Sequence, residues 1–144
     1  MQVFVGEQES DFNELRKALA LESQPPLLLF PNSDSLALEA RVAASQAPLH
    51  LIFIDATWRK AHKIWRLNTW LQAFPCYHFE NAPSGAYTLR KTRHAGRLST
   101  LEAVAYGLHL ATQVDVTPLY DIQASWVERK RQLMPAHIQG RYEL

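Results

Sequence analysis

The chain has 144 residues, 47% hydrophobic and 20% charged with a net charge of +1, which is typical of a folded globular protein and excludes extensive disorder. Its length suits one domain with a substantial core, so we expect residues 1–144 to form a single domain. The single cysteine, Cys76, excludes an intrachain disulfide and a cysteine-based zinc cluster and fits a cytoplasmic location, while an acidic amino terminus and the lack of a long apolar run argue against secretion or membrane insertion.

Short apolar runs alternate with helical patterns along the chain. Strands are predicted at Val3–Val5, Leu27–Phe30, Leu49–Ile54, Cys76–Phe79 and Tyr87–Leu89, and helices at Asp11–Leu21, Ser35–Ser45, Thr57–Gln72, Ser99–Gln113 and Leu119–Leu133. This alternation predicts an α/β fold with a mainly parallel sheet and helices on both faces.

The strand at residues 51–54 ends in an acid. Leu51, Ile52, Phe53 and Ile54 show no polar alternation, which is typical of a strand buried on both faces of a parallel sheet, and Asp55 follows at its carboxyl end. Ligands of open α/β sheets bind at this edge, so Asp55 is a candidate catalytic residue. The alternative is structural, because Asp55 or Thr57 could simply cap the next helix.

The helix predicted at residues 57–72 has an apolar stripe and a basic side. The stripe contains Trp58, Ala61, Ile64, Trp65 and Leu71, and the basic side contains Arg59, Lys63 and Arg66, with Lys60 adjacent. Residues 55–109 carry a net charge of +5, whereas residues 1–54 carry −4 and residues 110–144 carry none. This asymmetry favours an anionic partner such as nucleic acid, although an ordinary solvated helix face has the same pattern.

A turn followed by cations lies further along the chain. Pro83, Ser84 and Gly85 predict the turn, and the segment from Tyr87 to Leu89 returns to extended structure. Arg90 and Lys91 follow at once. An arginine fork suits a carboxylate or phosphate, but surface ion pairs use the same residues.

The helix predicted at residues 99–113 begins with a capping box. Ser99 and Glu102 have the Ser-x-x-Glu spacing, and an apolar run follows them. Capping explains this pattern fully. The amino terminus of a helix also binds carboxylates and phosphates, and Ser99 and Thr100 would add hydroxyl groups to such a site.

The motifs of metal and nucleotide sites are missing from the sequence. No two of the six histidines have the i, i+4 spacing of a helical metal site, and Cys76-x-His78 is an isolated pair. We therefore expect no bound metal. The sequence also has no G-x-G-x-x-G, phosphate-loop or G-x-S-x-G motif.

Four segments of the chain together resemble the DTW-domain family of tRNA-uridine aminocarboxypropyltransferases. The namesake motif stands here as Asp55-Ala56-Thr57-Trp58. The other three are Leu27-Leu28-Leu29-Phe30-Pro31-Asn32-Ser33 followed by Asp34, Ser84-Gly85-Ala86-Tyr87-Thr88-Leu89-Arg90-Lys91, and Ser99-Thr100-Leu101-Glu102-Ala103. The resemblance covers about residues 3–113.

The resemblance implies a SPOUT-like fold with a knotted carboxyl-terminal part that binds S-adenosylmethionine. It also implies transfer of the 3-amino-3-carboxypropyl group from this donor to ring nitrogen 3 of a tRNA uridine, with release of methylthioadenosine. Asp55 would then accept or orient the uridine proton. Thr57 would hold the turn or bond to Asp55, and Trp58 is either an aromatic wall of the site or part of the core.

The remaining roles follow from the same resemblance. The implied donor-binding residues are Ser84, Tyr87, Arg90, Ser99, Thr100 and Glu102, and the implied tRNA-binding residues are Arg59, Lys63, Arg66 and Lys91.

One feature departs from the family pattern. Many members have cysteines before the first strand that suit zinc, whereas this sequence starts Met1-Gln2-Val3-Phe4 without them, so we expect that segment to be absent. Two other functions stay open: a SPOUT-type RNA methyltransferase and a non-catalytic RNA-binding domain. The oligomeric state is open too, because Trp126 suits either an interface or a core.

Overall fold

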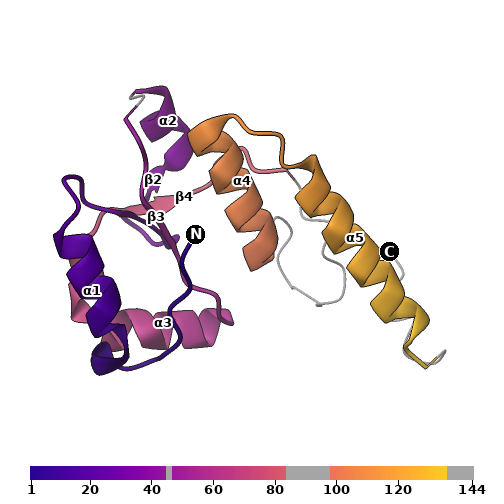
Figure 1. Ribbon diagram of the computed structural model, residues 1–144, viewed down its shortest axis with the longest axis horizontal. Coiled ribbons are helices and arrows are strands. Elements are labelled where there is room, and N and C mark those ends of the chain that lie inside the picture. Colours follow the sequence, from indigo (N-terminus) through magenta and orange to yellow (C-terminus); the bar gives the residue numbers. More distant parts are fainter. Residues whose placement is uncertain (45–46, 84–97, 136–144) are drawn as a thin grey trace. The chain divides into compact units, whose positions relative to one another are not determined.

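The structure is a computed structural model that describes residues 1–44, 47–83 and 98–135 (Figure 1). It contains two compact units, Met1–Glu80 and Asn81–Leu144, which are considered separately below. No helix in the described residues is long and apolar enough to cross a membrane. The expectation of a single domain stays a prediction.

The first unit is built on a four-stranded parallel sheet. Its strands are β1 (Leu27–Leu29), β2 (Leu36–Ala37), β3 (Leu51–Phe53) and β4 (Cys76–His78), in the order β2-β4-β1-β3. Leu28 pairs with Ile52 on one side and with Cys76 on the other, and Ala37 pairs with His78. The mainly parallel α/β sheet expected from the sequence is confirmed.

Helices flank the sheet, and those that follow β1 in the chain connect its strands. They are η1 (Glu9–Phe12), α1 (Asn13–Ala20), α2 (Leu38–Ala43), α3 (Trp58–Leu67) and η2 (Thr69–Ala73). The connection through α2 runs from β2 to β3, whereas the connection through α3 runs back from β3 to β4. Because parallel crossovers are right-handed, connections that run in opposite directions place their helices on opposite faces. Figure 1 shows α2 on one side of the strands and α1 and α3 on the other.

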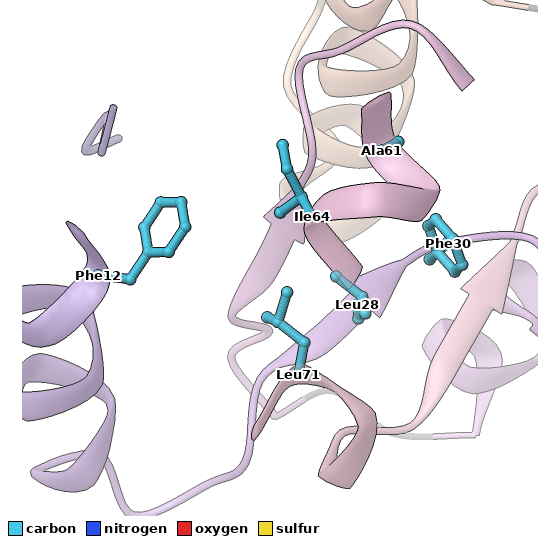
Figure 2. Packing of buried hydrophobic residues seen from close by; sticks show 6 residues of the cluster. All are labelled: Phe12, Leu28, Phe30, Ala61, Ile64 and Leu71. Atoms are coloured by element: carbon cyan, nitrogen blue, oxygen red, sulfur yellow. The ribbon is translucent and has the colours of Figure 1, made fainter. Parts of the chain in front are cut away.

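The core of this unit lies between the sheet and α3. Figure 2 shows Leu28 and Phe30 facing Ala61 and Ile64 of α3, and the same cluster includes Phe12 and Leu71. Leu28 is fully buried. Burial of each large apolar side chain contributes about 1.5–3 kcal/mol, so this packing fixes α3 against the sheet. The segment after β3, which contains Asp55, is held in place by the same contacts.

The helix predicted at residues 57–72 ends earlier than expected. The α-helix stops at Leu67, and the 3-10 helix η2 follows. Asn68 is fully buried, with its side-chain amide donating to the carbonyls of Ile64 and Glu7. Its carbonyl oxygen accepts a bond from Trp70 Nε1. The Asn68 backbone N–H still donates to the Ile64 carbonyl, but its side-chain bonds hold the residue in a non-helical conformation (φ −110°, ψ 73°), which ends the helix here.

One other predicted element was wrong and a second was only partly confirmed. Residues 3–5 form no strand, and Val3 and Val5 are exposed. The helix predicted at Ser35–Ser45 is the short strand β2 followed by α2, because Leu36 and Ala37 pair with β4. The strand predicted at Tyr87–Leu89 lies outside the described residues, as does Ser45.

The described helices of the second unit are α4 (Thr100–Thr112) and α5 (Thr117–Gln132), which pack against each other. Gln113 ends α4 with a φ of 58°, in the left-handed conformation that often closes helices.

Asp115 lies just before the start of α5. Its Oδ1 accepts a hydrogen bond from the Thr117 backbone N–H, and the side-chain and backbone bonds from Thr117 lower the pKa of Asp115. The helix α5 begins two residues before the predicted Leu119, because Pro118 fits within its first turn.

Candidate functional site

Asp55 lies just beyond the carboxyl end of β3. The strand ends at Phe53, Ile54 packs against the hydrophobic core, and Asp55 is exposed. Thr57, not Asp55, is the N-cap of α3, and its Oγ1 accepts a bond from the Lys60 backbone N–H at 3.4 Å. Of the two residues that the sequence offered as the cap of this helix, the structure therefore shows Thr57 in that role. Asp55 lies at the sheet edge where ligands of parallel sheets bind.

Trp58 is not part of the core. It is 41% exposed and lies at the end of a series of aromatic rings. Its ring centroid is 6.2 Å from that of His62, His62 lies 5.0 Å edge-on to Phe30, and Phe30 stacks on Trp65 at 5.4 Å. Its wide, flat ring, held at the start of α3, suits contact with a planar ligand such as a base.

The predicted basic side of α3 is present on the surface. Arg59, Lys63 and Arg66 are all exposed. Lys63 Nζ lies 3.0 Å from Glu7 Oε1, and Arg66 Nε donates to the His62 carbonyl at 3.3 Å. No carboxylate of the described residues forms an ion pair with Arg59 or Arg66. The helix therefore presents cations to solvent, one of them shared with an acid.

The structure also reveals a polar pair that the sequence did not indicate. Ser35 Oγ lies 3.0 Å from His78 Nδ1. The Ser35 hydroxyl donates to the Asn32 carbonyl at 2.9 Å, so the hydrogen in the bond to His78 comes from Nδ1. The two residues come from the β1–β2 turn and from β4, which are 43 residues apart in the chain. Only the folded structure shows that these segments are in contact.

The amino terminus of α4 carries the predicted capping box. Ser99 Oγ accepts a bond from the Glu102 backbone N–H at 3.2 Å, and Glu102 Oε2 accepts one from the Ser99 N–H at 2.6 Å. Glu102 is only 3% exposed. A third residue joins them from α5, because Gln123 Nε2 donates to Ser99 Oγ at 3.0 Å.

A buried polar cluster therefore underlies this helix end. Gln123 is 8% exposed, and its Oε1 has no hydrogen-bond partner among the described residues. Burial raises the pKa of the nearby Tyr120 hydroxyl, and the negative charge of Glu102 raises it further.

Several predicted site residues cannot be placed. Ser84, Tyr87, Arg90 and Lys91 lie outside the described residues, so their predicted roles remain predictions. Within residues 1–44, 47–83 and 98–135, no group of three or more histidine, cysteine or acidic side chains is arranged to hold a metal ion.

Comparison with known proteins identifies the family to which this chain belongs. The family described as "DTW domain" matches residues 1–133, so the chain belongs to the DTW-domain family. It is 35% identical over 85 residues to tRNA-uridine aminocarboxypropyltransferase 2 of Drosophila melanogaster. That match covers 59% of this chain but 34% of the relative, so the chain spans about a third of the relative's length. No solved structure matches.

Proposed function

We propose that this protein transfers the 3-amino-3-carboxypropyl group of S-adenosylmethionine to ring nitrogen 3 of a tRNA uridine. Membership of the DTW-domain family and the name of the Drosophila relative support this class of reaction. The single observation that carries the proposal is the exposed Asp55 at the carboxyl end of β3. Thr57 is the N-cap of α3, so the proposal assigns capping to Thr57 and the chemistry to Asp55.

Asp55 is the proton acceptor in this proposal. Its carboxylate takes the proton from uridine N3, and the freed electron pair of N3 forms the new nitrogen–carbon bond. S-adenosylmethionine, when bound, supplies an electrophilic carbon attached to a sulfonium, and the electrons of the broken carbon–sulfur bond leave with methylthioadenosine. Trp58 offers a face on which the uridine ring stacks, and this stacking orients N3 and excludes water.

The amino terminus of α4 fits the amino-acid end of the donor. Backbone N–H groups of the first turn and the helix dipole favour a carboxylate there, and Leu101 lies in that turn. Ser99, Thr100 and Glu102 shape this end of the helix. Ser84, Tyr87 and Arg90 complete the donor-binding set implied by the family resemblance.

The tRNA partner is proposed from charge. Arg59, Lys63 and Arg66 on α3, together with Lys91, would contact backbone phosphates. A SPOUT-like fold with a carboxyl-terminal knot, a cytoplasmic location and activity without a metal are part of the same proposal.

Product analysis tests this function. The purified protein is incubated with tRNA and S-adenosylmethionine, and both products are identified by mass spectrometry. We expect methylthioadenosine and a uridine heavier by one aminocarboxypropyl group. S-adenosylhomocysteine with a methylated base would replace the proposal with an RNA methyltransferase. Binding of RNA with neither product nor donor binding would replace it with a non-catalytic RNA-binding domain.

A further inference from the structure

The side-chain amide of Gln123 lies on the face of α5 that packs against α4. More than nine-tenths of this residue is buried, and its Nε2 donates to Ser99 Oγ at the N-cap of α4. Its Oε1 accepts no bond from any described residue. A buried amide oxygen without a donor costs free energy, because it has lost its bonds to water without replacement.

The surroundings of this oxygen define the ligand group it would take. The adjacent first turn of α4 presents backbone N–H donors and the positive end of the helix dipole, which favour an anion. Gln123 Oε1 is an acceptor and favours a cationic donor. An α-amino acid carries a carboxylate and an ammonium on the same carbon, so it satisfies both groups with one ligand.

Building on the proposed function, we infer that Gln123 Oε1 accepts a hydrogen bond from the α-ammonium of S-adenosylmethionine while the start of α4 holds the carboxylate. Gln123 is thus a specificity-determining residue for the donor. The product methylthioadenosine has no amino-acid end and makes neither contact. The same residue therefore favours binding of the donor over retention of the product.

The inference is tested with Q123M, which keeps the length of the side chain and removes its hydrogen bonds. Binding of S-adenosylmethionine, decarboxylated S-adenosylmethionine and methylthioadenosine is measured by calorimetry on the full chain. Because hydrogen bonds to charged groups are strong, we expect Q123M to weaken both amine-bearing ligands by about 10- to 100-fold. Methylthioadenosine binding stays unchanged. The control Q132M alters an exposed glutamine of the same helix and changes none of the three.

Three results would overturn the inference. Equal weakening of methylthioadenosine shows that Gln123 only maintains the shape of the site. A loss confined to ligands with a carboxylate shows that the amide binds that group through its nitrogen instead. Unchanged binding of all three ligands in Q123M shows that Gln123 has no role in binding the donor. If the wild-type protein binds no S-adenosylmethionine, the proposed function itself fails, which is a separate outcome.

A measurement on the wild-type protein needs no variant to fold. The side-chain amide resonances of Gln123 are followed by NMR during titration with each ligand. We expect them to shift with S-adenosylmethionine and with its decarboxylated form and to stay in place with methylthioadenosine. Equal shifts with all three ligands contradict the inference.

Discussion

Two helix starts in this protein combine a hydroxyl cap with an acid and use the acid in opposite ways. At α3 the cap is Thr57, and Asp55 precedes it and is exposed. At α4 the cap is Ser99, and Glu102 follows it. Glu102 is buried, and its Oε2 accepts a hydrogen bond from the Ser99 backbone N–H. Glu102, three residues after its cap, reaches back to the backbone of Ser99, whereas Asp55 stands two residues before its cap and outside the helix. The two acids therefore differ in their position relative to the cap and in burial, and the predictions below test whether they also differ in function.

The largest expected effect is at the exposed acid. Asp55→Asn should lower the rate of methylthioadenosine release by at least about 100-fold, because general bases typically contribute 10²–10⁴-fold. Its free energy of unfolding in urea should change by about 1 kcal/mol or less, since the N-cap of α3 is Thr57 and Asp55 is exposed. Near-normal turnover in D55N would remove Asp55 from the chemistry.

Substitution of the buried acid, Glu102, should mainly affect stability. Glu102→Ala leaves the Ser99 N–H without its acceptor and should lower the free energy of unfolding by about 1–3 kcal/mol. Glu102→Gln is the matched control, because glutamine also completes a capping box and should cost less. Urea unfolding measures both variants. Unchanged stability of E102A combined with lost donor binding would assign Glu102 to the ligand instead.

These differences also show how much the sequence could predict. The sheet strands at 27–30, 49–54 and 76–79, both caps and the basic face of α3 depend on residues close together in the chain, and each was readable from a short pattern. The early end of α3 was not, because Asn68 bonds to Glu7, 61 residues away. The Ser35–His78 pair spans 43 residues, and the bond between Ser99 and Gln123 spans 24. Such contacts depend on which elements pack together, and no local pattern specifies them.

A smaller effect is expected at the cap of α3. Thr57→Ala removes the acceptor of the Lys60 N–H and should lower the free energy of unfolding by about 1 kcal/mol. Thr57→Ser restores the hydroxyl and should recover most of this loss. If T57A instead abolishes turnover at full stability, the hydroxyl of Thr57 acts on Asp55 or on substrate rather than on the helix.

The smallest effect concerns the helices that follow the two caps. The helix α3 continues as a basic face beside Asp55, whereas α4 continues as the apolar run Ala103–Ala105. Lys63→Ala should weaken binding of all tRNAs alike and reduce the slope of log affinity against log salt by about 1, as expected for one phosphate contact. Glu7→Gln should act in the opposite direction, because it frees Lys63 from its ion pair. Salt titrations of both variants separate the two possibilities. An unchanged slope in K63A together with unchanged affinity in E7Q would make Lys63 part of a solvated surface, and the contrast between α3 and α4 would then rest on Asp55 alone.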